Sequence, residues 1–366
     1  MTSRNLVNSN LKPSFRQQNL PACQPILTAG TVLPTFFLIG VAFVPIGIGL
    51  LTASNNVQEY IRDYTDCVSI NPIYRNQPCA SIAEKRVNQS HDCQCQLDIE
   101  ITHDFKKDVY FYYGLSNFHQ NHRRYVKSRD DVQLLGNPLV TNSDCAPFEK
   151  AVDPNDPTGT PKPIAPCGAI ANSKFNDTFV LKSPNSGVIQ MTRVGIAWES
   201  DKQIRFRNPQ LKSEDQSLAR AFNGTVKPPY WPKPVYELHV GDNDLNGFQN
   251  EDLIVWMRTA ALPTFRKLYA SIKADGSEVT LSRGNYSLII HYNFPVTAFN
   301  GRKRFIISDT SWLGGKNPFL GIAYIVVGCG CFLLSAFFLF IHKKYGMAPQ
   351  EITQISQTTP YLSTHS

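Results

Sequence analysis

The segment 242–247 reads Asp-Asn-Asp-Leu-Asn-Gly, and its side chains could open a calcium-binding loop. Such a loop takes oxygen ligands from positions 1, 3 and 5, a glycine at position 6 and a bidentate glutamate at position 12. Asp242, Asp244, Asn246 and Gly247 fit the opening, but position 12 is Leu253. Because the bidentate ligand is missing, we interpret the segment as a tight turn of the kind that Asp, Asn and Gly favour.

A second polar cluster places His119 and His122 beside Arg123 and Arg124. The spacing is not that of H-E-x-x-H, and no acidic ligand lies close by in the sequence. The cluster could contact phosphate or a lipid headgroup, or it could belong to an ectoenzyme; we favour a polar helix face that bonds its own domain or a partner. The chain has no G-x-S-x-G, P-loop or dinucleotide fingerprint. The sequence therefore predicts no catalytic residues, no cofactor and no metal site.

Six of the nine cysteines lie in the central region of the chain, and an even number there suits a disulfide framework in an oxidising compartment. They are Cys67, Cys79, Cys93, Cys95, Cys145 and Cys167. The last two lie some fifty residues beyond the others, so we predict that they pair with each other. The remaining cysteines, Cys23, Cys329 and Cys331, lie in or near the terminal apolar regions.

Within the first cluster, Cys93 and Cys95 are poor partners for each other because side chains at i and i+2 of a strand point the same way. Two pairings remain open: the nested one, Cys67 with Cys95 and Cys79 with Cys93, and the crossed one. A zinc site is disfavoured because it needs C-x₂-C pairs and suits a reducing compartment.

Two apolar stretches without a charged residue, 27–51 and 318–341, stand near the ends of the chain. Each exceeds the roughly 20 residues that cross a hydrocarbon core. The first is too long for the h-region of a cleaved signal peptide, so we predict an uncleaved anchor. The second places Gly321, Gly328 and Ser335 at seven-residue intervals, which predicts one face for close helix packing. Neither stretch holds an ionisable group that could line a polar substrate pathway.

The orientation follows from the flanking charges and the glycosylation motifs. The tail before the first stretch has three basic and no acidic residues, and His342, Lys343 and Lys344 follow the second stretch, so both tails are predicted to be cytosolic. All four N-x-S/T sequons, at Asn88, Asn176, Asn223 and Asn285, lie between the stretches. The central domain is therefore predicted to be lumenal or extracellular and glycosylated.

The net charge of +7 does not indicate nucleic acid, because the tails carry four of these charges and the large central domain only about three. The predicted organisation is a cytosolic tail (1–26), a membrane helix (27–51), an ectodomain (52–317), a second membrane helix (318–341) and a second cytosolic tail (342–366).

Alternating apolar residues predict an antiparallel β-sandwich for the ectodomain. Strands are expected at 97–105, 109–113, 194–198, 203–207, 235–240, 286–292 and 304–307. Two helices are expected, at 115–126 and 259–270.

Long segments of this sequence resemble the cell cycle control protein 50 family, also called the transmembrane protein 30 family. The resemblance covers nearly the whole chain and is carried by residues 17–34, 112–118, 121–130, 163–173, 250–268 and 312–324. It implies a jelly-roll-like ectodomain, nested disulfides in the first cluster, a bond between Cys145 and Cys167, and a glycan at Asn176.

The resemblance also implies the function. Members are accessory β-subunits of type IV P-type ATPases, which flip phospholipids between leaflets. The chain would bind the catalytic subunit as a heterodimer in contact with membrane phospholipids, help it to leave the endoplasmic reticulum and support transport. The expected locations are the endoplasmic reticulum, Golgi, endosomal and secretory vesicles and plasma membrane. A stand-alone receptor for glycans or adhesion is the alternative.

Overall fold

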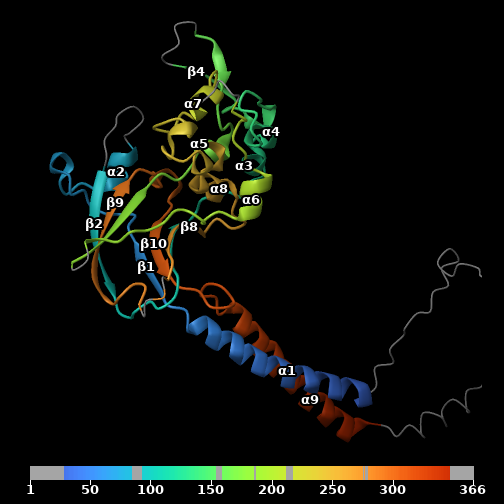
Figure 1. The fold of residues 1–366 in the computed structure, drawn as a ribbon. Helices are drawn as coiled ribbons and strands as arrows, with labels where there is room; N and C mark the ends of the chain where they lie inside the picture. Colours follow the sequence, from blue (N-terminus) through green and yellow to red (C-terminus); the bar gives the residue numbers. More distant parts are fainter. Residues whose placement is uncertain are drawn as a thin grey trace, which may run out of the picture. The chain divides into compact units, whose positions relative to one another are not determined.

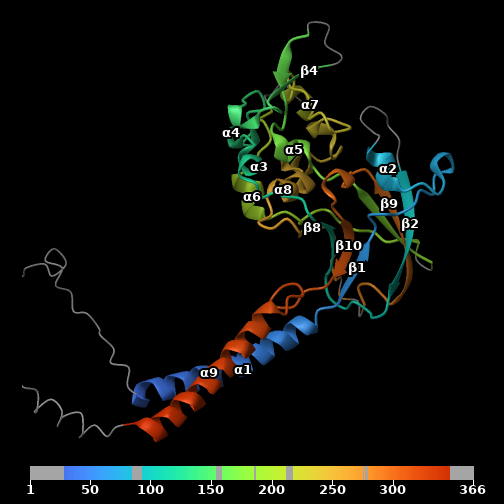
Figure 2. The same ribbon diagram turned by 180° about the vertical axis from the view of Figure 1, so that it is seen from behind.

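The computed structural model describes residues 29–84, 93–153, 159–184, 187–211, 217–274, 276 and 279–346. The chain divides into two compact units, residues 1–52 with 317–366 and residues 53–316. The first unit holds two long apolar helices, and the second holds the strands and short helices (Figures 1 and 2).

Helices α1 (Ala29–Asn55) and α9 (Phe319–Tyr345) are each 27 residues long and apolar enough to cross a membrane. Their length, about 40 Å at 1.5 Å per residue, exceeds a hydrocarbon core of roughly 30 Å. α1 continues through Pro34 and Pro45, and α9 carries His342, Lys343 and Lys344 in its last turn. The prediction of two membrane helices that flank a β-rich domain is confirmed.

The β-rich unit is built on two four-stranded antiparallel sheets. The first has the order β1 (Glu59–Asp63), β10 (Lys303–Ser308), β3 (Val109–Leu115) and β8 (Phe265–Ile272). The second has the order β2 (Cys93–Ile101), β9 (Gly284–Tyr292), β6 (Thr178–Ser183) and β7 (Gly187–Val188). A separate hairpin joins β4 (Lys150–Val152) and β5 (Pro161–Pro163).

One hydrophobic core lies between the two sheets. Phe179 of β6 is central to it, because its ring lies 4.8 Å from the rings of both Phe305 on β10 and Tyr269 on β8. From Tyr286 on, buried and half-buried residues alternate along β9, as expected when one face of a strand packs on a core and the other is more open. The two sheets therefore form the predicted sandwich.

Short helices gather beside β8 at one side of the sandwich (Figures 1 and 2). They are α3 (Arg123–Lys127), α4 (Asp131–Leu134), α5 (Ala169–Asn172), α6 (Glu199–Ile204), α7 (Leu218–Ala221) and α8 (Glu251–Met257). Another, α2 (Cys79–Glu84), lies beside β2. We call the group α3 to α8 the helical module. Single 3-10 turns occur at Pro72–Tyr74, Ser143–Cys145, Val235–Glu237, Asn243–Leu245, Gly247–Gln249 and Thr297–Phe299.

Both helix predictions for this unit need correction. The segment 259–270 ends in strand β8, because pairing with β3 and burial against the core override its helical pattern. The segment 115–126 begins with the last residue of β3 and turns at Asn117, whose φ is +59°, so that only its end enters α3.

Three strand predictions are wrong. The segment 194–198 is a loop that leads into α6, and 203–207 covers the end of that helix and the loop after it. The segment 235–240 starts with a 3-10 turn. Each is rich in apolar or aromatic residues but has no partner strand in the described part of the chain, and a strand without a ladder is not stable. The other strand predictions are confirmed, with shifted ends.

Candidate functional site

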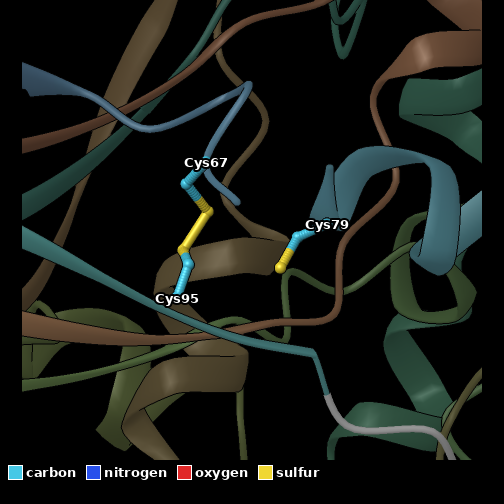
Figure 3. Close-up of side chains that lie close together, drawn as sticks. All are labelled: Cys67, Cys79 and Cys95. Atoms are coloured by element: carbon cyan, nitrogen blue, oxygen red, sulfur yellow. A yellow bond between two sulfur atoms is a disulfide. The ribbon is translucent and has the colours of Figure 1, made fainter. Parts of the chain in front are cut away.

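Two disulfides fasten the segment after β1 to the start of β2. Cys67 is bonded to Cys95 and Cys79 to Cys93, which is the nested arrangement. Figure 3 shows the Cys67–Cys95 bond with the Cys79 sulfur beside it. The sulfur atoms of Cys67, Cys79 and Cys95 lie within 4.8 Å of one another, but all three are in disulfides and offer no thiolate to a metal.

The third disulfide, Cys145–Cys167, lies in the helical module, where Gln133 binds the same segment. Gln133 is fully buried, and its amide nitrogen donates to the carbonyls of Pro138 and Ile164 while its amide oxygen accepts from the Cys167 N–H at 2.8 Å. A buried amide that uses both its donors and its acceptor fixes the backbone around it. The bond and the glutamine together hold the Cys167 loop against α4.

Segments far apart in the sequence meet in the helical module. Trp256 of α8 is fully buried, and its indole N–H donates to the Ile170 carbonyl of α5 at 2.7 Å. The Gln120 side chain accepts from the Ala260 N–H at 2.9 Å. Gly168 packs so closely that a Cβ there would lie 2.1 Å from the Ser128 carbonyl oxygen. The contacts join the segments 121–130, 163–173 and 250–268, three of those that carry the family resemblance.

A buried ion pair connects the two sheets. Lys303 of β10 is fully buried, and its Nζ donates to Asp177 Oδ2 at 2.6 Å and to the Phe294 carbonyl at 2.7 Å. Asp177, just before β6, also accepts from the Phe294 N–H and from the Tyr64 hydroxyl. Burial and this carboxylate raise the pKa of Tyr64 well above its usual value. Both charges are therefore desolvated but fully satisfied.

A second buried lysine lies on β8 and has no acidic partner among the described residues. Lys267 Nζ donates to the carbonyls of Val255, Trp256 and Arg258 at 2.8, 2.7 and 2.5 Å. These carbonyls belong to the C-terminal end of α8, where the helix itself leaves them without partners. Burial and the nearby Arg258 charge lower the pKa of Lys267 to about 7. The lysine thus ties α8 to the sheet.

Helices α1 and α9 pack closely within their own unit, in antiparallel order. A Cβ added at Gly321 would lie 2.7 Å from the Leu51 nitrogen, and one at Gly328 would lie 2.8 Å from the Val44 side chain. Ser335 Oγ donates to the Leu33 carbonyl at 3.4 Å. The three small residues singled out in α9 therefore face α1 of the same chain.

Sequence reasoning missed the matching glycines of α1. A Cβ at Gly40 would lie 2.9 Å from the Phe332 ring, and one at Gly47 would lie 2.7 Å from the Ile325 side chain. Gly40 and Gly47 are seven residues apart, as Gly321 and Gly328 are, so the same spacing was the available signal. Both helices contribute small residues to one seam.

The family model of the LEM3 (ligand-effect modulator 3) family / CDC50 family matches residues 50–348. This chain belongs to that family. Its matched region includes the whole β-rich unit and α9.

This chain covers most of the length of the curated relatives that it matches. Cell cycle control protein 50A of Mus musculus is 51% identical over 91% of the chain and 88% of its own length. Cell cycle control protein 50B of Homo sapiens is 46% identical over 91% of the chain and 93% of its own length. ALA-interacting subunit 3 of Arabidopsis thaliana is 40% identical over 90% of the chain and 84% of its own length. The resemblance stated from the sequence is confirmed.

The remaining polar candidates of this CDC50-family chain form no metal-type group with one another in the described residues. His119, His122, Arg123 and Arg124 are exposed at the start of α3, and no metal-type cluster in the described ranges includes them. Asp242 Oδ1 accepts from the Asp244 N–H at 2.8 Å, as in an Asx turn.

The described sequons differ in how exposed their asparagines are. Asn223 and Asn285 are exposed, and Asn176 is half-buried beside Asp177. Asn88 and Cys23 lie outside the described residues.

Proposed function

We propose that this chain is the non-catalytic accessory subunit of a type IV P-type ATPase that moves phospholipids. The observation that carries the proposal is the CDC50-family match across residues 50–348. One relative, 40% identical to this chain, is named an ALA-interacting subunit, so its name describes a subunit that interacts with another protein. In this view ATP hydrolysis and lipid movement belong to the partner chain.

The helix pair supports a role beside a larger transporter. The seam between α1 and α9 takes up Gly40, Gly47, Gly321 and Gly328, so most of the surface left exposed is bulky and apolar. It includes Phe37, Leu38, Val326, Val327 and Leu333, all exposed. Two helices without a charged residue in the spans offer a transported headgroup no polar path, whereas they suit packing against other helices.

We further propose that both tails are cytosolic and that the β-rich unit is lumenal or extracellular, with glycans on its sequons. Three disulfides suit an oxidising compartment. From that side the unit would assist folding of the catalytic subunit, its exit from the endoplasmic reticulum and its transport cycle. The complex would then occupy the Golgi, endosomal or secretory vesicles or the plasma membrane.

Co-purification tests this proposal. The full-length chain with an affinity tag is extracted from its native membranes in mild detergent, and the bound proteins are identified by mass spectrometry. A type IV P-type ATPase should be recovered in near-equal amount. A second variant of the chain, Gly328→Leu, disturbs the α1–α9 seam and should lower recovery. Absence of any P-type ATPase above background would refute the accessory role.

A further inference from the structure

A cavity of about 330 Å³ lies where the segment before β6 meets the loop 230–233 and the first turn of α8. Its wall includes Asn176, Lys174, Trp231 and Asp252. A volume near 300 Å³ is at the small end of ligand pockets. A ligand no larger than one or two sugar rings would fill it.

The cavity wall carries a glycosylation motif. Asn176, Asp177 and Thr178 form an N-x-T sequon, and all three line the cavity. The side-chain amide of Asn176 makes no hydrogen bond to any described residue, so it is free to carry a substituent. Asp177 is held by Lys303 and by two backbone N–H groups, which fixes the position of Asn176.

The same wall offers an unused hydrogen-bond donor. The Lys174 ammonium has no hydrogen bond or ion pair with the described residues and lies 5.9 Å from the centre of the Trp231 ring. Burial lowers the pKa of Lys174. Its neighbour Arg193 is already occupied, because it pairs with Asp252 at 2.9 Å and stacks 4.1 Å over Tyr269. An ammonium offers three donors, and leaving them unpaired in a cavity costs free energy.

Aromatic and cationic groups in one small cavity fit a sugar. The carbon face of a pyranose ring packs on an aromatic ring, and its hydroxyl and acetamide oxygens accept hydrogen bonds. Tyr230, 73% exposed, and Trp231, 4% exposed, provide the aromatic wall. Lys174 and Lys233 provide donors.

We propose that this cavity is the seat of the innermost N-acetylglucosamine of a glycan on Asn176, with its acetamide oxygen bound by Lys174 and its ring against Tyr230 and Trp231. The proposal rests on the lumenal location given under the proposed function. Covalent attachment keeps the sugar at a high effective concentration, so weak contacts suffice to hold it. The glycan then acts as a fixed part of the fold, unlike one on an exposed turn.

Enzymatic deglycosylation of the folded protein tests the proposal. The purified full-length chain in detergent is treated with peptide-N-glycosidase without denaturation, and the glycan on each site is followed by mass spectrometry over time. Release at Asn176 should be at least tenfold slower than at Asn223, which is exposed after α7 and serves as the internal control. Equal rates at the two sites would overturn the proposal.

Variants separate the cavity from general protection. Lys174→Met should raise the rate of release at Asn176 toward that at Asn223, whereas Lys182→Met, at an exposed position of β6, should change neither rate. Tyr230→Ala is a second variant, suitable if Lys174→Met fails to fold, because this side chain is largely exposed. If neither Lys174→Met nor Tyr230→Ala alters the ratio of rates, the cavity does not hold the sugar.

Thermal unfolding provides a second readout. Asn176→Gln should lower the unfolding midpoint more than Asn223→Gln does, because only the first removes a packed sugar.

The partner must also be considered in the test. Protection of Asn176 should persist in chain purified free of any ATPase, and protection seen only in the complex would overturn the proposal. A natively folded chain that carries no sugar on Asn176 would also overturn it. None of these outcomes determines whether an ATPase co-purifies with the chain, so the accessory-subunit proposal is tested separately.

Discussion

The α1–α9 pair and the β-rich unit hold distant segments together by different contacts. In the helix pair, glycines let backbone approach backbone, as where a Cβ at Gly321 would meet the Leu51 nitrogen at 2.7 Å. In the β-rich unit, disulfides and buried lysines connect the segments, as where Lys303 reaches Asp177. Lipid tails are as apolar as the helix surfaces, so hydrophobic burial cannot drive the helices together and close fit must do so.

The difference teaches where each region is vulnerable. A charge buried in the β-rich unit is stable only with its partner, so removal of one partner is costly. A helix seam without charges is damaged by added volume instead. Substitutions that remove a group should therefore act most strongly in the β-rich unit, and substitutions that add a group should act in the helix pair.

The largest effect is expected for Asp177→Asn, which leaves the Lys303 ammonium fully buried without a counter-charge. The cost should be about 3–5 kcal/mol in the free energy of unfolding. Thermal or denaturant unfolding of the purified protein measures it. The control is Asp108→Asn, which breaks the exposed pair with Lys273 and should cost under about 1 kcal/mol. Similar losses for the two variants would contradict the contrast.

Removal of the third disulfide should cost slightly less. Cys145 and Cys167 are 22 residues apart, and loss of a bond that closes such a loop should destabilise the protein by about 3 kcal/mol. The double variant Cys145→Ser with Cys167→Ser should lose most of its surface delivery and unfold at a lower temperature. Cys329→Ser, at an exposed free cysteine of α9, should behave as the parent protein. Normal delivery of the double variant would show that Gln133 alone holds the loop.

In the helix pair, Gly328→Leu should cost about 1–3 kcal/mol by overpacking against Val44. Gly330→Leu is the matched control, because a Cβ at Gly330 meets nothing within 4 Å. The readout is the yield of a short cysteine cross-link between Leu33→Cys and Ser335→Cys in a chain without Cys329 and Cys331. The yield should fall with Gly328→Leu and hold with Gly330→Leu; a fall with both would place the seam elsewhere.

The smallest effect is the pH dependence that Lys267 brings. Its pKa in the fold, about 7, is below the usual value near 10.5, so between these values the unfolded chain binds more protons. The parent protein should therefore gain stability relative to Lys267→Met as the pH rises from 7, by at most about 1.4 kcal/mol per unit. Unfolding midpoints of both proteins at pH 7, 8 and 9 measure this. If the difference between the two unfolding midpoints does not change with pH, the three carbonyl groups keep Lys267 protonated in the folded protein.

The sequence predicts best what depends on local pattern. Charge-free length marks α1 and α9, and two-residue alternation marks β2, β3 and β9, because each pattern reflects a single environment along the element. β8 was predicted as a helix because its strand character comes from pairing with β3, about 150 residues earlier in the chain.

The candidate site shows the same limit. The pairs Cys67–Cys95 and Cys79–Cys93 could be narrowed to two pairings from spacing, but the buried lysines gave no signal. In the sequence, Lys267 lies in the predicted helix 259–270 and Lys303 lies just before the predicted strand 304–307, and no neighbouring residue marks either lysine as buried. Only the fold brings α8 and Asp177 to them.

The pairing of β1 with β10 has a mechanical consequence. α1 ends at Asn55 shortly before β1, and α9 begins at Phe319 shortly after β10, so the chain enters and leaves the sandwich through adjacent antiparallel strands. A force that separates the two membrane helices would open this ladder one residue pair at a time, starting at Glu59 and Ser308.

Two contacts stabilise that end of the β1–β10 ladder. Glu59 is bonded to Arg266, and the Gln58 N–H donates to Asp309 at 2.8 Å. Lateral tension between the helices would meet these bonds first and would reach the disulfides only after β1 had peeled away. The β1–β10 pair would therefore open from the end that is connected to the two membrane helices.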